Sequence, residues 1–240
     1  MESLKIVVLI PAWNEEGPVV RVIEDLPKEL IYKIIVCDNG STDRTSELAK
    51  AAGAEVVWQP ERGYGNACLA GINYLKSLTK EQQPDIVVFL DGDHSDFPEE
   101  LPLIIKPVIE QNKDLVIGSR LLGNMEPGAM TLPQRFGNWL APLLIKWFFG
   151  YTFSDLGPFR AIKWQKLLEL QMADRNYGWT VEMQVKAAKH GLTYAEVPVR
   201  YRKRKLGKSK VSGTVKGAIL AGIKIIGTIL KEKYKLNRTN

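Results

Sequence analysis

The sequence has few of the residues that build disulfide frameworks or soft-metal sites. Its 240 residues include two cysteines and two histidines, and the spacing of Cys37 and Cys68 matches no metal-binding motif. Cys37 lies within an apolar run, which favours a buried free thiol. We therefore do not expect a disulfide-stapled secreted domain.

Long apolar runs and low-complexity segments are also missing. No stretch reaches the 18 uninterrupted apolar residues that indicate a membrane-spanning helix, and the apolar run within residues 1–11 is too short for a signal peptide. No internal repeat or Gly/Ser linker divides the chain. With 45% hydrophobic and 25% charged residues, the composition is that of an ordinary globular protein. We predict no transmembrane segment in this chain.

The net charge of +6 conceals an uneven distribution. Residues 200–240 contain 13 Lys and Arg residues and one acidic residue, whereas the first 199 residues carry a net charge of −6. Such a basic segment predicts an anionic partner, which could be phospholipid, a phosphorylated substrate or nucleic acid. Apolar residues are interspersed through it, and it contains no nucleic-acid-binding motif. We expect contact with an anionic membrane rather than nucleic acid, with a solubilising tail as the alternative.

Short apolar runs alternate with segments of helical spacing along the first half of the chain. The runs are rich in β-branched residues, as in strands that are buried on both faces of a parallel sheet. The alternation predicts an α/β fold whose mostly parallel sheet is flanked by helices. The expected strands are residues 4–10, 33–38, 55–58, 85–90 and 114–118, and the expected helices are residues 17–30, 42–53, 66–77 and 101–111.

Polar residues cluster where these expected strands end. Asn14 and Glu15 follow the first strand, Asp38 ends the second, and Asp91 and Asp93 follow the fourth. Ligands of open parallel sheets bind beyond the carboxyl ends of the strands. We therefore expect these side chains to share one cleft.

Asp91 and Asp93 are separated by a single flexible glycine. This spacing lets both carboxylates reach one hard cation, and Mg²⁺ and Mn²⁺ both suit carboxylate and phosphate oxygens. Such a cation would bridge to a diphosphate and offset the charge that develops on it as a leaving group. We predict Asp91 and Asp93 as the metal ligands.

Residues 62–66 (RGYGN) form a glycine-containing loop before an expected helix. Gly65 would let the backbone approach a ligand closely, and a helix N-terminus favours phosphate. The loop is not a Walker A loop, since no Gly-Lys-Ser/Thr closes it, and it lacks the dinucleotide-binding glycine pattern. We expect Gly65 to contact a phosphate-containing ligand.

Taken together, these motifs resemble those of family 2 glycosyltransferases, which have the GT-A fold. The order and the gaps match as well as the motifs do, through residues 11–15 (PAWNE), 38–43 (DNGSTD), 62–66 (RGYGN) and 91–93 (DGD). Later segments resemble the dolichyl- or polyprenyl-phosphate mannose synthase branch, through residues 118–120 (GSR), Arg135 with Asn138, residues 154–160 (SDLGPFR) and residues 204–210 (RKLGKSK). The similarity implies a single GT-A domain with a Rossmann-like sheet.

The resemblance also implies an inverting, metal-dependent transfer of a hexose from GDP-mannose or UDP-glucose to a polyprenyl or dolichyl phosphate. The residues implied in binding the nucleotide-sugar are Pro11, Asn14, Glu15, Asp38, Gly65, Asp91, Arg204 and Lys210. The residues implied in catalysis are Asp93, Arg120 and Arg135, of which the arginines would bind the acceptor phosphate. Two positions depart from the family pattern: Asn39 stands where a second Asp is usual, and Ser95 where the branch often has Gln.

The acceptor determines which catalyst the enzyme needs. A phosphate is already anionic at pH 7 and needs positioning, whereas a hydroxyl needs a nearby base. Arginine binds phosphate bidentately, so the later motifs favour a phosphate acceptor. Glu182 is the candidate base for the alternative, transfer to a sugar or small hydroxyl, unless it is simply a polar helix residue. A third hypothesis is a nucleic-acid-binding protein, whose binding would not depend on Asp91 or Asp93.

Two amphipathic stretches predict contact with a lipid surface. Residues 136–148 place apolar side chains, including Trp139 and Trp147, at helical spacing, and residues 215–231 repeat the pattern with lysines opposite. The second apolar face would contain Val215, Ile219, Ile223, Ile226 and Leu230. Packing on the sheet or in a homodimer is the alternative for both. We expect a GT-A domain over residues 1–212 and a basic helix over residues 213–240, peripheral on the cytoplasmic face of a membrane.

Overall fold

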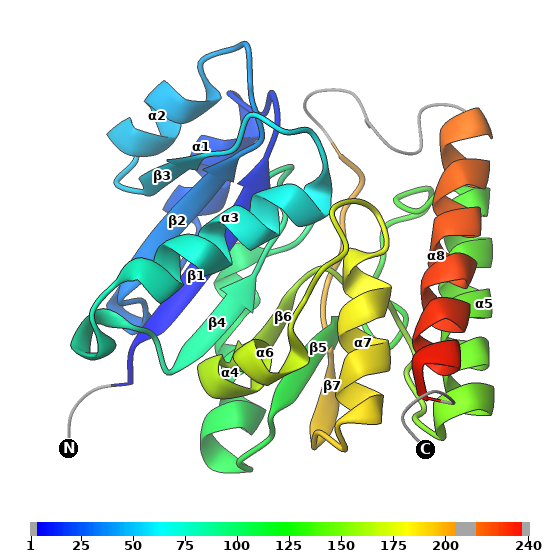
Figure 1. The fold of residues 1–240 in the computed structure, drawn as a ribbon. Coiled ribbons are helices and arrows are strands. Elements are labelled where there is room, and N and C mark those ends of the chain that lie inside the picture. Colours follow the sequence, from blue (N-terminus) through cyan, green and yellow to red (C-terminus); the bar gives the residue numbers. More distant parts are fainter. Residues whose placement is uncertain (1–3, 205–214, 237–240) are drawn as a thin grey trace.

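A seven-stranded sheet forms the centre of the molecule, with strand order β3-β2-β1-β4-β6-β5-β7 (Figure 1). The computed structural model describes residues 4–204 and 215–236. All neighbouring strands are parallel except β6, which is antiparallel to both β4 and β5. The strands are β1 (Ile6–Ala12), β2 (Lys33–Asp38), β3 (Glu55–Trp58), β4 (Ile86–Phe89), β5 (Leu115–Ser119), β6 (Arg160–Lys163) and β7 (Tyr194–Pro198). The predicted mostly parallel α/β sheet is confirmed.

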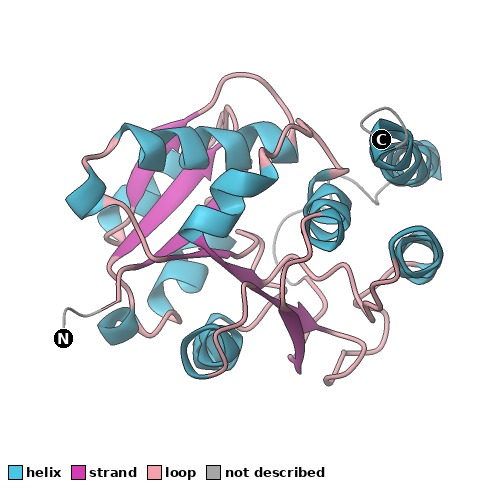
Figure 2. Cartoon of the chain, turned by 60° about the horizontal axis from the view of Figure 1, so that its bottom comes forward, coloured by secondary structure: helices cyan, strands magenta, loops and turns pink. Residues whose placement is uncertain are grey.

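Helices cover both faces of this sheet (Figure 2). One face packs against α1 (Pro18–Glu24), α2 (Thr45–Ala51) and α4 (Leu101–Glu110). The other face packs against a layer to which α3 (Tyr64–Ser77), α5 (Leu132–Phe149), α6 (Trp164–Leu170), α7 (Trp179–Lys189) and α8 (Val215–Leu236) contribute. Short 3₁₀ turns occupy Lys28–Leu30, Lys80–Gln82 and Pro98–Glu100.

The apolar runs form strands because each strand lies between two helical layers. Along β1, Val7 and Leu9 belong to one core, whereas Val8 and Ile10 belong to the other, and all four are fully buried. Successive side chains of a strand point to opposite faces, so a strand covered on both sides is apolar throughout. Each such side chain stabilises the fold by about 1.5–3 kcal/mol relative to an exposed one.

The sequence patterns did not predict β6, which begins with a charged residue. Arg160 is fully buried, and its guanidinium donates to the carbonyl oxygens of Leu156 (2.9 Å), Gly157 (2.9 Å) and Thr180 (3.0 Å). Burial lowers the pKa of Arg160 to about 10. A four-residue strand with a cation at each end carries no apolar run, so only the tertiary structure reveals it.

The two predicted amphipathic helices lie side by side at one end of the molecule (Figure 1). A capping box of Thr131 and Gln134 starts α5, which continues past Pro142. α8 packs on α5 and α7 and buries Ile229 completely, while Leu230, on the face expected to be apolar, is 36% exposed. Over its described part, the segment expected as a separate unit at residues 213–240 thus shares the core of the domain.

Three residues of the face predicted for α8, Val215, Ile219 and Ile223, lie outside the described side chains. Among the helices within residues 4–204 and 215–236, none has the length and apolar character that crossing a bilayer requires.

Candidate active site

The acid-bearing strand ends meet at one edge of the sheet. Asp38 of β2 is in register with Ala12 of β1, and the loop after β4 lies against the same end of β1. A Cβ added to Gly92, between the two aspartates of that loop, would be 3.2 Å from the carbonyl oxygen of Pro11. The convergence of these loops, predicted from the strand pattern, is therefore present.

Hydrogen bonds join the loops that follow β1 and β2. The Asn14 backbone N–H donates to Ser41 Oγ (2.8 Å), and the Thr42 N–H donates to Asn14 Oδ1 (2.8 Å). Asp38 is fully buried, and its carboxylate accepts from the Ser41 N–H (2.8 Å) and from the Ser46 hydroxyl. Asp38, expected to hold the base and ribose, thus supports the loop that would surround them.

Asn39 explains one departure from the family pattern. Its Nδ2 donates to the carbonyl oxygens of Glu61 (2.6 Å) and Gln59 (3.3 Å), and its Oδ1 accepts from the Gly63 N–H (2.7 Å). A carboxylate has no N–H to donate to these two carbonyl oxygens. Asparagine at this position therefore fastens the end of β2 to the loop before α3.

Asp91 and Asp93 form an acidic pair that their surroundings hold in place. Tyr64 Oη donates to Asp91 Oδ1 (2.8 Å), and the Ser95 N–H donates to Asp93 Oδ1 (2.9 Å). Burial and the neighbouring charge of Asp93 raise the pKa of Asp91 to about 7. Such incompletely compensated negative charge fits a divalent cation.

No cluster of three or more His, Cys, Asp or Glu side chains suited to a metal forms within the described parts of the chain. Mg²⁺ sites often use one or two carboxylates together with substrate phosphates. The Asp91 and Asp93 pair fits that kind of site, in which the donor itself completes the coordination.

Arg204 links the loops after β1 and β4. Its guanidinium donates to both carboxylate oxygens of Glu15, and its Nη1 lies 3.5 Å from Asp93 Oδ2. Glu15 is only 6% exposed, so this ion pair is largely shielded from water. The structure thus places Arg204 beside Asp93, whereas Lys210, expected like Arg204 to bind the donor, lies outside the described residues.

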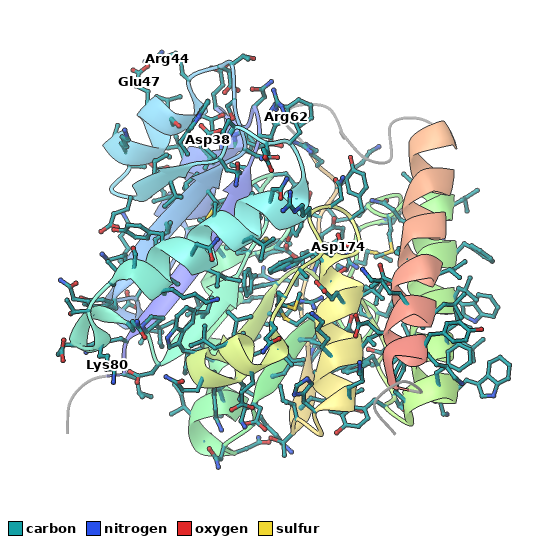
Figure 3. All side chains as sticks on the ribbon, in the orientation of Figure 1. Asp38, Arg44, Glu47, Arg62, Lys80 and Asp174 are labelled. Atoms are coloured by element: carbon teal, nitrogen blue, oxygen red, sulfur yellow. The ribbon has the colours of Figure 1, made fainter. Side chains whose placement is uncertain are left out.

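The glycines of the RGYGN motif admit protein backbone instead of a ligand. A Cβ added to Gly65 would be 2.0 Å from the Asp174 carbonyl oxygen, and one added to Gly63 would be 2.1 Å from that of Arg175. The Asn66 N–H, in the first turn of α3, donates to the Arg175 carbonyl oxygen (3.0 Å). The close approach expected of a phosphate at Gly65 is therefore made by the segment before α7, where Figure 3 shows Asp174.

Glu182 does not have the surroundings of a general base. Its carboxylate accepts from the N–H groups of Ala173 (3.1 Å) and Asp174 (2.8 Å), and Lys186 Nζ lies 2.8 Å away. Glu182 is 4% exposed. A carboxylate whose oxygens are already bound to backbone and ammonium groups is poorly placed to take a proton from a substrate hydroxyl. These contacts favour its interpretation as a structural residue.

Arg120 is held rigidly beside the acidic loop. Its Nε and Nη2 donate to the Asp155 carboxylate at 2.8 and 2.7 Å, and its guanidinium lies 4.9 Å from the ring centroid of Tyr201. Burial by itself would raise the pKa of Asp155, but Arg120 outweighs it and the pKa is lowered. Arg120 is therefore fixed in orientation by a bidentate ion pair.

A cavity of about 430 Å³ lies between α5 and the segment before β6. Arg135 and Lys146 supply positive charge to a lining that is otherwise mainly apolar or neutral. The lining residues are Leu121, Met130, Arg135, Asn138, Trp139, Pro142, Leu143, Lys146, Thr152, Phe153 and Ser154. Arg135 lines this cavity, whereas Arg120 is the chain neighbour of the lining residue Leu121.

An exposed apolar stripe follows the outer face of α5. Its members recur every three or four residues, which places them on one side of the helix. They are Leu132, Phe136, Trp139, Leu143 and Trp147, and they range from 49% to 78% exposed. On the opposite side of α5, Ala141 and Ile145 are fully buried. We call this surface the α5 stripe.

Three polar residues of the site were not singled out from the sequence. Tyr64 lies inside the RGYGN motif, and Asp155 lies inside the segment 154–160, so the motifs themselves could have indicated them. Asp96 follows Asp91 and Asp93 closely in the sequence, but this position alone indicated no role for it. It is 1% exposed, neither of its carboxylate oxygens has a hydrogen-bond partner among the described residues, and burial raises its pKa well above the usual range.

Comparison with known proteins identifies the family of this chain. The family model "Glycosyl transferase family 2" matches residues 7–169. A dolichyl-phosphate hexose transferase of Haloferax volcanii is 31% identical over 233 residues, which cover 95% of this chain and 96% of that protein. An undecaprenyl-phosphate mannosyltransferase of Micrococcus luteus is 27% identical over 238 residues, with 92% and 93% covered.

A solved structure has the same fold at low sequence identity. Glucosyl-3-phosphoglycerate synthase of Mycobacterium tuberculosis, in complex with Mn²⁺, UDP and phosphoglyceric acid, superposes with a TM-score of 0.73 at 22% identity. The match covers 96% of this chain and 78% of that one. The chain therefore belongs to glycosyl transferase family 2 and is a glycosyltransferase with the GT-A fold.

Proposed function

We propose that the enzyme transfers a hexose from a nucleotide-sugar to a polyprenyl phosphate at a membrane surface, with inversion at the anomeric carbon. One observation carries the proposal: Trp139 and Leu143 belong to the exposed α5 stripe and also line the cavity that contains Arg135 and Lys146. An apolar surface that runs into a cationic cavity matches an acceptor with a long hydrocarbon chain and an anionic head group.

The donor diphosphate is proposed to bind at Asp91 and Asp93 through Mg²⁺ or Mn²⁺. A bound divalent cation would offset the negative charge that develops on the nucleoside diphosphate as it leaves. Asn14, Glu15 and Asp38 would form the surroundings of the base and ribose, and Arg204 would pair with the phosphates. The Mn²⁺ and UDP in the complex of the mycobacterial synthase support this arrangement.

The acceptor is proposed to be a phosphate because the site offers cations where a hydroxyl acceptor would need a base. A phosphate is anionic at pH 7, so Arg120 and Arg135 need only hold it in line with the anomeric carbon. The contacts of Glu182 argue against the hydroxyl alternative. The names of the Haloferax and Micrococcus relatives support the phosphate acceptor.

We further propose that the α5 stripe lies in the membrane interface, on the cytoplasmic face, without spanning the bilayer. Trp and Phe are favoured at the boundary between head groups and acyl chains. The excess of Lys and Arg after residue 199 supports attraction to anionic lipid. A homodimer that covers the same stripe is the alternative, and it would appear as a concentration-dependent mass in solution.

A thermal-shift panel tests the donor half of the proposal. The enzyme is heated with GDP-mannose, UDP-glucose, GDP or UDP, each with Mn²⁺ or Mg²⁺. A ligand that binds the native state raises the melting temperature, so we expect stabilisation by nucleotides of one base only, and its loss with EDTA or in Asp91→Asn. Failure of every nucleotide to stabilise the protein with either metal would refute the donor site.

A further inference from the structure

We propose that residues 173–178, which we call the brace, position the carboxylate of Asp91 through the turn that carries Tyr64. Glu182 is then a positioning residue of the transferase, because it holds the brace. The inference rests on the proposed role of Asp91 at the donor diphosphate, and it goes beyond that role by naming what keeps Asp91 in place. Four consecutive contacts carry it.

The first contact fixes the start of the brace to α7. Glu182 accepts from the N–H groups of Ala173 (3.1 Å) and Asp174 (2.8 Å), and Lys186 Nζ pairs with the same carboxylate (2.8 Å). Lys186 Nζ also donates to the carbonyl oxygen of Gln171 (2.7 Å). Hydrogen bonds to charged groups in buried surroundings are strong, so α7 holds this backbone firmly.

The second contact consists of hydrogen bonds within the brace and of close packing between the brace and α8. Asp174 Oδ1 accepts from the N–H groups of Asn176 (2.7 Å) and Gly178 (3.2 Å). A Cβ added to Gly178 would be 2.5 Å from Asp174 Oδ2 and 2.7 Å from Thr228 Oγ1. The brace therefore lies so close to α8 that Gly178 has no room for a side chain.

The third contact joins the brace to the RGYGN turn through backbone alone. The Arg175 carbonyl oxygen accepts from the Asn66 N–H (3.0 Å). Gly63 has a φ of 136°, and any side chain on Gly63 or Gly65 would collide with the carbonyl oxygens of Arg175 and Asp174. The two glycines thus allow the brace to press directly on the turn.

The fourth contact reaches the acidic pair. Tyr64 stands between the two glycines, and its hydroxyl donates to Asp91 Oδ1 (2.8 Å). A tyrosine phenol is protonated at neutral pH, so Tyr64 is the donor in this hydrogen bond. A displacement of about 1 Å at a catalytic group can cost 10²-fold in rate. Movement of the brace would therefore be felt at the donor diphosphate.

A matched control separates this positioning role from a general contribution to stability. Asp114 has the same chemistry at the opposite edge of the sheet, before β5. Its carboxylate accepts from the N–H (2.9 Å) and hydroxyl (2.9 Å) of Thr193, and Lys163 Nζ lies 3.1 Å away. Asp114→Asn therefore removes an equivalent backbone-holding carboxylate that has no contact with the donor site.

The experiment measures melting temperature and the Kd for UDP and for GDP, each with Mn²⁺, in the full chain and in Glu182→Gln, Tyr64→Phe, Asp114→Asn and Asp91→Asn. We expect Glu182→Gln and Tyr64→Phe each to raise the Kd of the bound nucleotide about tenfold, the effect of one lost hydrogen bond to a charged group. Asp114→Asn should lower the melting temperature while the Kd changes less than twofold.

Combining Glu182→Gln with Tyr64→Phe tests whether the two residues act in one chain. We expect the double variant to bind nucleotide no more weakly than Tyr64→Phe alone. Additive losses, or an unchanged Kd in Glu182→Gln, would overturn the brace. If Glu182→Gln does not fold, Tyr64→Phe with an unchanged Kd would overturn it as well. An unchanged Kd in Asp91→Asn would instead refute the proposed donor site.

Discussion

The two halves of the sheet present opposite kinds of surface. The strands β3, β2, β1 and β4 are all parallel, and polar loops joined by hydrogen bonds follow their carboxyl ends. Next to β6, β5 and β7 lie α5 and α8, which pack on each other. This part also contains the cavity lined by Arg135 and Lys146 and the exposed α5 stripe. Under the proposed function, the first half binds the donor diphosphate and the second binds the acceptor, and we call them the donor half and the acceptor half.

Each half contains a feature that lowers the stability of the folded protein. In the donor half, Asp91 is buried beside the charge of Asp93, and both effects raise its pKa to about 7. In the acceptor half, large apolar side chains such as Trp147, which is 76% exposed, remain on the surface. Natural proteins break local rules of this kind mainly at functional sites. The ligand of each half should therefore be the factor that relieves its unfavourable feature.

The largest expected effect comes from Asp91→Asn in the donor half. Loss of a charged group at the proposed metal and diphosphate site should lower kcat/KM by about 10²–10³-fold or more, measured as sugar transfer from the preferred donor. The same variant should melt at a higher temperature than the wild type at pH 8 without ligands, because the unfavourable charge is gone. Lower stability at pH 8 would contradict this account of the acidic pair.

The sign of the pH dependence follows from the raised pKa of Asp91. A carboxyl whose pKa is raised in the folded state binds more protons there, so it lowers stability progressively as the pH rises from about 4 to about 7. The difference in melting temperature between Asp91→Asn and the wild type should therefore be small at pH 4 and reach its full size above pH 7.

Arg135→Gln should produce the next largest effect, confined to the acceptor half. Losing charge-assisted hydrogen bonds should raise the KM for polyprenyl phosphate by about 10–100-fold. The Kd for the donor nucleotide with Mn²⁺ should stay within twofold of the wild type. A parallel loss of donor binding would show that the two halves are not separate sites.

Trp147→Gln should weaken attachment to lipid by roughly tenfold, since it removes an exposed aromatic side chain from the stripe. Co-sedimentation with vesicles that contain anionic phospholipid measures the effect. Trp58→Gln is the matched control, because Trp58 is 56% exposed and ends β3 in the donor half. Equal losses in both variants, or none in Trp147→Gln, would argue against an oriented contact through α5.

Asn39→Asp should have the smallest effect on transfer and act mainly on stability. Facing a carboxylate with the carbonyl oxygens of Gln59 and Glu61 should cost about 1–3 kcal/mol. We expect a melting temperature lowered by a few degrees and donor binding weakened several-fold, because the loop before α3 loosens. Asn124→Asp, the same change at an exposed position, should leave both quantities unaltered.

The features that depend on short segments of the chain could be predicted from the sequence. The strands β1 to β4 are apolar runs, and Asp91 and Asp93 follow one of them directly, so the edge of the sheet where they meet could be predicted from strand order alone. The amphipathic pattern of α5 likewise identified Trp139 and Trp147 before the structure showed them exposed.

Contacts between distant segments could not be predicted in this way. The glycines at 63 and 65 suggested a ligand, but the backbone of Arg175 and Asp174, more than 100 residues further on, occupies the space beside them. Glu182 was a candidate base because the sequence does not show its partners. The N–H groups of residues 173 and 174 reach its carboxylate only after the chain has turned into α7. For α8, periodicity alone did not identify Ile229, which is fully buried, as a core residue, since α5 and α7 determine which face is covered.

The most direct test of the account is a transfer assay with radiolabelled donor and polyprenyl phosphate in vesicles. The enzyme is incubated with UDP-glucose or GDP-mannose labelled in the sugar, with Mn²⁺, and the organic phase is counted. We predict that label enters the lipid fraction from one donor only, that EDTA abolishes its appearance, and that Asp91→Asn slows it by about 10²-fold or more. Transfer that persists in EDTA, or label that reaches only water-soluble acceptors, would contradict the central claim.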